Sequence, residues 1–212
     1  LLFGVAFANI FKGIPIDGEG VFRGTLFTFL NPYGLAGGFL FLFLFLLHGS
    51  LWLSVKTEGE LHDRAVSLAK RLWVPAVVLV VIFLIMTAFS TSLYRNYLKA
   101  PALFVIPLAA ACFLFAARAT LAASPVKAWW ASSLAIVFVT FFGIAGLYPA
   151  MLPSSLDPAY SLTALNSASG TLTLKIMLVV ALIFVPIVII YQTWAYRLFK
   201  GKVGGEDAGH EW

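Results

Sequence analysis

Five uninterrupted apolar runs of about 20 residues each constrain this 212-residue chain most strongly. A helix rises 1.5 Å per residue, so roughly 20 apolar residues cross a hydrocarbon core about 30 Å thick. Charged residues make up only 11% of the chain, against about 25% in an ordinary soluble domain. The sequence therefore predicts an all-α fold, a polytopic transmembrane helical bundle, and it excludes soluble, disordered and fibrous classes. The five full spans are expected over 33–55, 72–94, 101–121, 128–150 and 174–199.

The first eleven residues, LLFGVAFANIF, are apolar but too few to cross the membrane. They carry neither the basic region nor the small-residue cleavage site of a signal peptide. We expect them to be the end of a partial N-terminal span. We also expect 1–212 to be a single membrane domain within a longer protein whose first helices precede residue 1.

Basic residues are unevenly divided between the two sides of the predicted bundle, nine on one side and five on the other. By the positive-inside rule the side with nine is cytoplasmic, and so is the C-terminus. The net charge of +5 then reflects topology and lipid headgroups, and it does not indicate a nucleic acid partner. The nine are Lys56, Arg64, Lys70, Arg71, Arg118, Lys127, Arg197, Lys200 and Lys202, and the five are Lys12, Arg23, Arg95, Lys99 and Lys175.

Two loops differ from the rest of the chain. The segment 56–71, KTEGELHDRAVSLAKR, has mixed charge and is expected to be a solvated cytoplasmic loop. The segment 151–173 is rich in serine, threonine and proline, and Asp157 is its only charged side chain before the last span. We expect this second loop to lie across the membrane face or against a partner.

Candidate ligands and acid–base groups are few. Of the histidines, only His48 lies in a predicted span, while His62 and His210 lie in a loop and in the tail. We expect His48 to bond to backbone or water at the interface, with a role as a lone haem ligand as the alternative. No carboxylate lies within the five spans, and the single cysteine, Cys112, cannot form a metal cluster alone. The sequence therefore predicts no catalytic, cofactor-binding or metal-ligating residue in this chain.

Small residues and prolines within the spans bear on packing. Gly34, Gly37 and Gly38 share a helix face that allows close approach of another helix. Prolines inside spans remove backbone donors and are expected to kink their helices. They are Pro75, Pro107 and Pro186, of which Pro186 is the most central and is expected to shape the bundle most.

Four blocks of sequence resemble subunit II of cytochrome bd-type quinol oxidases. The first is 4–9 (GVAFAN) followed by 12–15 (KGIP), similar to the pattern GxAFGNxxxGxP, with Ala8 where the family often has glycine. The second runs from His48-Gly through Trp52-Leu to Lys56-Thr57 and Gly59. The other two are 147–155 (LYPAMLPSS), and 161–175 with the apolar run that follows it. Their order matches the family, and together they cover most of the chain.

The resemblance implies a haem-free subunit that packs against a haem-bearing subunit I as a pseudo-symmetric partner. Haem b and haem d, or haem b alone, would then lie in that partner, with quinol as the substrate of the complex. The expected location is the bacterial plasma (inner) membrane. For the contact with subunit I, we expect the Gly34, Gly37 and Gly38 face and the 151–173 loop. The alternative function is a permease or secondary transporter, which would call for internal repeats or a polar mid-membrane site.

Overall fold

The computed structural model describes residues 1–198 and 201–202, and helices account for most of these residues. Five of the helical segments are long and apolar enough to cross a membrane. The elements are α1 (Leu2–Lys12), α2 (Leu26–Phe29), α3 (Pro32–Lys56), α4 (Gly59–Ser90), α5 (Tyr94–Lys99), the 3-10 turn η1 (Pro101–Phe104), α6 (Val105–Thr120), α7 (Pro125–Leu147), β1 (Ala150–Leu152), the 3-10 turn η2 (Pro158–Tyr160), β2 (Leu162–Thr163) and α8 (Thr171–Leu198).

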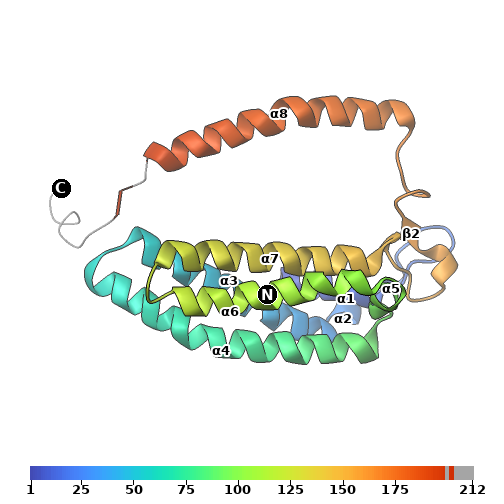
Figure 1. Cartoon of the computed structure of the whole chain (residues 1–212). Helices are drawn as coiled ribbons and strands as arrows, with labels where there is room; N and C mark the ends of the chain where they lie inside the picture. The colour runs from blue at the N-terminus through green and yellow to red at the C-terminus, as the bar shows by residue number, and fades with distance from the viewer. Residues whose placement is uncertain (199–200, 203–212) are drawn as a thin grey trace.

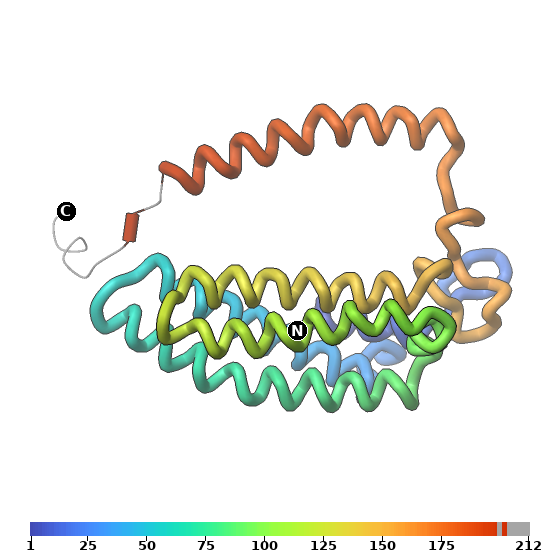
Figure 2. The backbone as a smooth tube through the Cα atoms, viewed as in Figure 1, coloured from blue at the N-terminus to red at the C-terminus, as the bar shows by residue number. Residues whose placement is uncertain are grey.

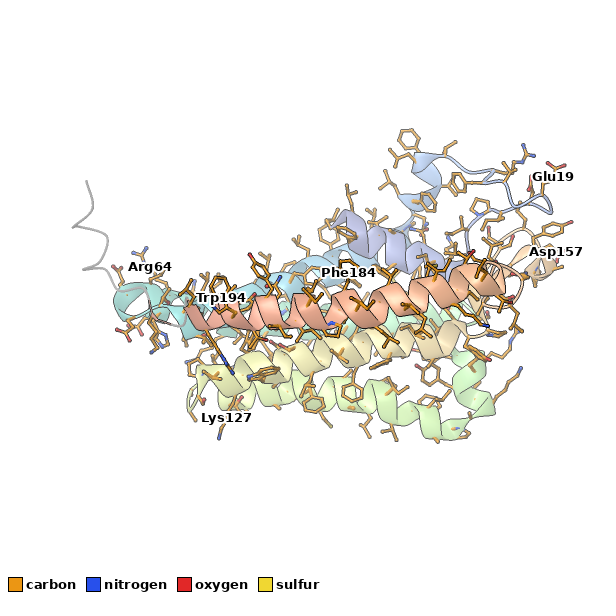
Figure 3. The ribbon with its side chains drawn as sticks, turned by 90° about the horizontal axis from the view of Figure 1, so that it is seen from above. Glu19, Arg64, Lys127, Asp157, Phe184 and Trp194 are labelled. Atoms are coloured by element: carbon orange, nitrogen blue, oxygen red, sulfur yellow. The ribbon has the colours of Figure 1, made fainter. Side chains whose placement is uncertain are left out.

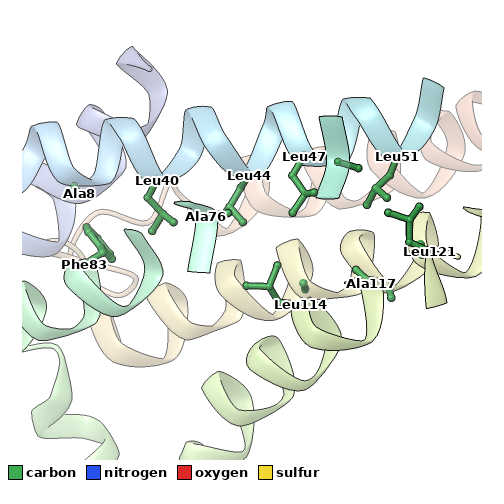
Figure 4. Packing of buried hydrophobic residues seen from close by; sticks show 14 of the residues in the cluster. Ala8, Leu40, Leu44, Leu47, Leu51, Ala76, Phe83, Leu114, Ala117 and Leu121 are labelled. Atoms are coloured by element: carbon green, nitrogen blue, oxygen red, sulfur yellow. The ribbon is translucent and has the colours of Figure 1, made fainter. Parts of the chain in front are cut away.

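Helices α3, α4, α6 and α7 form a bundle of alternating direction, and α1 packs along one half of α3 (Figure 1). The membrane-spanning parts of these helices are apolar all round, so no polar face orients them. The helices are instead positioned by a shared strip of buried side chains, here called the seam. That seam is made of leucines from α3 and mostly alanines from its neighbours, with one large side chain each from α4 and α6 (Figure 4). It contains Leu40, Leu44, Leu47 and Leu51 of α3, Ala69, Ala76 and Phe83 of α4, Leu114 and Ala117 of α6, and Ala128, Ala131 and Ala135 of α7.

Two helices begin where side chains cap free backbone N–H groups. Asn31 accepts a hydrogen bond from the Gly34 amide, and Pro32 occupies the first turn of α3. Ser124 likewise accepts from the Lys127 amide, with a proline following it, at the start of α7. Proline suits a first turn because the N–H that it lacks has no helical partner there. These caps set the lower boundaries of α3 and α7 close to those predicted.

The five predicted spans are confirmed, but the expectation of a solvated loop over 56–71 is wrong. After a two-residue break at 57–58, α4 begins at Gly59 and continues unbroken through the charged segment into the membrane. That segment is rich in glutamate, leucine, alanine, lysine and arginine, which favour helix, and it contains no proline. Arg64 also bonds to Glu60 one turn earlier at 2.6 Å. The charged turns therefore extend the helix beyond the bilayer.

Helix α8 lies apart from the bundle along most of its length, as Figures 1 and 2 show. In the most apolar 18-residue stretch of α8, no residue is buried within the described chain. Near its C-terminal end, the Tyr196 ring contacts the Trp52 ring of α3, with centroids 5.9 Å apart. Pro186 lies inside α8, as predicted, and its expected effect on the bundle stays a prediction. Pro107 lies in the first turn of α6, where proline is tolerated without a kink.

The turns at one end of the bundle fold into a polar cap made of segments 13–24 and 149–167. Ile14 exchanges backbone hydrogen bonds with Pro153 and Ser155, at 2.8 and 3.0 Å. Ser154 donates its hydroxyl to the Ile16 carbonyl at 2.6 Å. The expected long loop 151–173 thus contains most of β1 and all of η2 and β2, and it pairs with the first loop of the chain. Its last three residues belong to α8. Figure 3 places Glu19 and Asp157 at this end, and Arg64 and Lys127 at the opposite, basic end.

Candidate functional site

His48, the histidine inside a predicted span, ties α3 to α7. Its Nδ1 lies 2.8 Å from the Ser132 hydroxyl oxygen, and that hydroxyl lies 2.8 Å from the Trp129 carbonyl. Because a carbonyl only accepts, Ser132 donates to Trp129 and His48 Nδ1–H donates to Ser132. The imidazole also stacks on the Trp129 ring, with centroids 5.7 Å apart. The partner of His48 Nδ1 is therefore a hydroxyl on a neighbouring helix, where the sequence suggested backbone or water.

The other candidate ligands are scattered. His62 lies on the first turns of α4 and contacts the Ser54 carbonyl through Nδ1 at 2.8 Å. Cys112 is exposed on α6. Among the described residues, no group of three or more His, Cys, Asp or Glu side chains is placed to hold a metal ion. His210 and the acidic residues Glu206, Asp207 and Glu211 of the tail lie outside the described residues, as do Phe199 and Lys200.

Two buried polar contacts join helices and were not foreseen from the sequence. The Tyr33 hydroxyl of α3 lies 2.8 Å from the Thr87 hydroxyl of α4, and both side chains are buried. Asn9 of α1 donates to the carbonyls of Val5 and Phe29, at 2.7 and 2.8 Å, and its oxygen accepts from Asn31 at 2.6 Å. The signal that could have found these residues is a polar side chain in a long apolar helix, where a partner is required.

Buried side-chain polar groups are satisfied in the part of the chain that the structure describes. No buried side-chain nitrogen or oxygen there lacks a hydrogen-bond partner. These buried bonds hold helices together.

The glycine face of α3 packs against α1, so the expectation that it contacts another subunit is wrong. A methyl group built on Gly37 would lie 2.5 Å from the Cβ of Ala8, and one on Gly38 would lie 2.8 Å from Val5 Cγ2. Both distances are far inside van der Waals contact. The close approach predicted from the small residues is confirmed, but its partner is a helix of the same chain. A stripe of small residues indicates close packing without identifying what packs there.

Two cavities in the membrane-spanning part are lined almost entirely by apolar side chains. One of about 450 Å³ lies between α1, α3, α4 and α7, and is lined by residues such as Phe11, Phe41 and Phe83. A smaller one, of about 180 Å³, lies between α3, α4, α6 and α7. Neither is lined by a carboxylate, histidine or cysteine of the described residues. Their chemistry suits hydrocarbon, and the hydroxyls that line them, Ser132 in the smaller cavity and Thr140 in the larger, both donate to carbonyls of their own helix.

Comparison with protein families decides which group the chain falls into. The family model described as cytochrome bd terminal oxidase subunit II matches residues 1–199. The chain belongs to this family. Among its relatives is the cytochrome bd ubiquinol oxidase subunit 2 of Bacillus subtilis (strain 168), 28% identical over 206 residues. The cytochrome bd-I ubiquinol oxidase subunit 2 of Escherichia coli (strain K12) is 30% identical over 244 residues. The probable cytochrome oxidase subunit 2 of Haemophilus influenzae (strain ATCC 51907 / DSM 11121 / KW20 / Rd) is 28% identical over 237 residues.

These three alignments cover nearly all of this chain but only part of each relative. They include 96%, 98% and 96% of the chain, in the order given above, and 60%, 63% and 62% of the relatives. The chain thus spans about three fifths of their length. None of the three is named as a transporter, so the permease alternative gains no support. The five apolar helices and the subunit II family together make this a multi-pass membrane protein.

Two of the four sequence blocks that resemble subunit II meet at the polar cap. Asn9 and Gly13 of the first block end α1, and Gly13 adopts a positive φ of 98°. A side chain there would be strained and would approach Ser155 of the third block. The blocks 12–15 and 147–155 are far apart in sequence, yet they lie beside each other through the Ile14 and Ser154 contacts. The cap thus brings these two blocks into contact.

Proposed function

We propose that this chain is a membrane subunit of a cytochrome bd-type quinol:oxygen oxidoreductase, and that it supports a haem-bearing subunit I without ligating haem. The observation that carries the proposal is the family match over residues 1–199. In the complex, the haems of the partner, b and d or b alone, supply the electron transfer from quinol to oxygen. Quinol, subunit I and membrane lipid are the proposed partners, and nucleic acid is not among them.

The described residues of this chain do not fit a haem. An axial pair in a helical bundle needs ligands on facing helices at similar depth. Of the histidines in the five described spans, His48 lies on α3 with its Nδ1 and ring face engaged by Ser132 and Trp129, and His62 lies in the charged first turns of α4 with its Nδ1 on the Ser54 carbonyl. His48 therefore acts as an interhelical tie. No step of the reaction is assigned to a residue of this chain.

The proposed location is the bacterial plasma (inner) membrane, with the C-terminus in the cytoplasm. The helices alternate in direction, so the 57–58 and 121–124 turns and the end of α8 share the basic end of the bundle. The rule that places basic residues on the cytoplasmic side supports this orientation. Tryptophans near span ends also gather at this end, and they are Trp52, Trp73, Trp129, Trp130 and Trp194.

The proposed contact with subunit I uses the 151–173 loop and no longer the glycine face. Large apolar side chains of the cap remain open, among them Met151, Leu156 and Leu165. Exposed apolar groups on a polar loop are typical of surfaces that another protein covers.

Deletion of the gene in its native host, with complementation, tests the proposal. We expect membranes from the deletion strain to lose quinol-dependent oxygen consumption of the bd type, and the restored gene to recover it. A wild-type rate in the deletion strain, in cells that express no second bd oxidase, would contradict the proposal.

A further inference from the structure

The basic end of the bundle contains a pocket that the proposed function does not use. It has a volume of about 470 Å³ and lies between the end of α3, the first turns of α4 and the 121–126 turn. Its lining combines three basic side chains with apolar ones. The basic residues are His62, Lys70 and Lys202, and the apolar residues are Val55, Val66, Leu121, Ala122, Pro125 and Val126.

The basic groups come from separate parts of the chain, and no carboxylate of the described residues lines the pocket. His62 and Lys70 lie two turns apart on α4, whereas Lys202 follows α8. Lys202 does pair with Glu58, at 3.5 Å, but both side chains are more than half exposed. Such an exposed pair is weak, and an anion can compete with it. The pocket therefore favours an anionic ligand.

The orientation of His62 is fixed by a backbone contact. Its Nδ1 lies 2.8 Å from the Ser54 carbonyl oxygen, and Ser54 also lines the pocket. Because the carbonyl only accepts, Nδ1 carries the proton in that bond. The second ring nitrogen of His62, Nε2, is then left to bond to a ligand, and it donates a hydrogen bond when the ring carries both protons.

The apolar half of the lining distinguishes among anions. A free phosphate gains nothing from Val66, Pro125 and Val126, whereas a phospholipid buries acyl carbon there. The position also suits a lipid, because Lys70 lies where the charged turns of α4 give way to the apolar part of the helix. Basic pockets between helices at this depth bind anionic head groups.

We propose that this pocket binds an anionic glycerophospholipid, with the phosphodiester between His62, Lys70 and Lys202 and an acyl chain against the apolar wall. Binding of the lipid would fasten the start of α4 to the 121–126 turn and to Lys202.

Native mass spectrometry of the full-length protein tests this site, with its co-purifying subunits, in a mild detergent. Phosphatidylglycerol is titrated against phosphatidylcholine, and Lys70→Gln and His62→Gln are compared with wild type. The matched control is Lys127→Gln, which removes a positive charge at the same end but from a residue that does not line the pocket. We expect a preferred phosphatidylglycerol adduct in wild type and in the control, weakened about fivefold in Lys70→Gln.

Three results would overturn the proposal. The first is equal retention of the two lipids by wild type. The second is equal weakening in Lys127→Gln and Lys70→Gln, since that would indicate a general effect of surface charge. The third is displacement of the lipid adduct by inorganic phosphate at comparable concentration, which would identify free phosphate as the ligand. If Lys70→Gln fails to assemble, Val126→Trp fills the pocket from a half-exposed position and must reduce the same adduct.

Discussion

The buried hydroxyl pair between Tyr33 and Thr87 leads to an asymmetric prediction. Thr87 Oγ1 lies 2.7 Å from the Phe83 carbonyl, which can only accept, so Thr87 donates its proton to Phe83. The Tyr33 hydroxyl, 2.8 Å from Thr87, must then be the donor between the two helices. The Tyr33 ring stacks on the Phe83 ring at 5.0 Å, and a phenylalanine at position 33 keeps that contact.

The two single substitutions remove different halves of this bond. Tyr33→Phe takes away the donor and leaves Thr87 bonded to Phe83, so we expect a loss of about 0.6–1 kcal/mol. Thr87→Val keeps the shape of the side chain but leaves the buried Tyr33 O–H without an acceptor, at a cost of about 1–3 kcal/mol. In the double variant nothing is stranded, so adding Tyr33→Phe to Thr87→Val should restore stability or leave it unchanged.

The free energy of unfolding is measured for the full native polypeptide by reversible titration with SDS in mixed micelles, followed by tryptophan fluorescence. Thr140→Val is the matched control, because Thr140 also bonds to the carbonyl four residues earlier but is exposed on α7. We expect the control to change stability by less than about 0.5 kcal/mol. Equal costs for the two single variants, or simple addition in the double variant, would refute the assigned direction of the hydrogen bond.

Three further predictions concern other parts of the chain. Gly37→Leu, where even a methyl group would clash with α1, should cost about 1–3 kcal/mol in the same titration. Gly49→Ala on the same helix has open space and should be neutral or stabilising, so equal costs would contradict the packing. His48→Phe should leave the reduced-minus-oxidised haem spectrum of the complex unchanged, and loss of a haem band would show that His48 is a ligand. Hydrogen bonds from the Val21 amide and then from Arg23 lower the pKa of Asp17. The ionised Asp17 carboxylate therefore stabilises the loop above about pH 4, and this stabilisation is lost as the pH falls below that value. The protection factor of the Val21 amide, which is its exchange rate compared with that of an unfolded chain at the same pH, should therefore fall on acidification in wild type. A protection factor with the same pH dependence in Asp17→Asn would contradict this.

The spans could be predicted because apolar length is a property of the sequence alone. Their ends could not be placed as well, since a charged segment such as 59–71 is compatible with both loop and helix. Its helix-forming residues, and the Glu60 to Arg64 pair, favour continuation of α4. Hydropathy reports where a helix enters lipid, whereas backbone propensity and capping determine where it begins.

The contacts of the candidate site depended on tertiary structure that no local pattern contains. Ser154 and Ile16 are 138 positions apart, and their bond is what orders the long loop. The partner of His48 lies 84 positions away on α7. The blocks that resemble the family are local in sequence, whereas the contact between 12–15 and 147–155 at the cap depends on tertiary structure.

The central claim is that this chain supports a haem-bearing partner while ligating no haem itself. The direct measurement is the visible absorption spectrum of the chain, purified through an affinity tag from its native host and from the same host lacking the gene for subunit I. We expect reduced haem bands in the first preparation and none in the second, at equal amounts of folded polypeptide. Stoichiometric haem retained in the absence of subunit I would contradict the account.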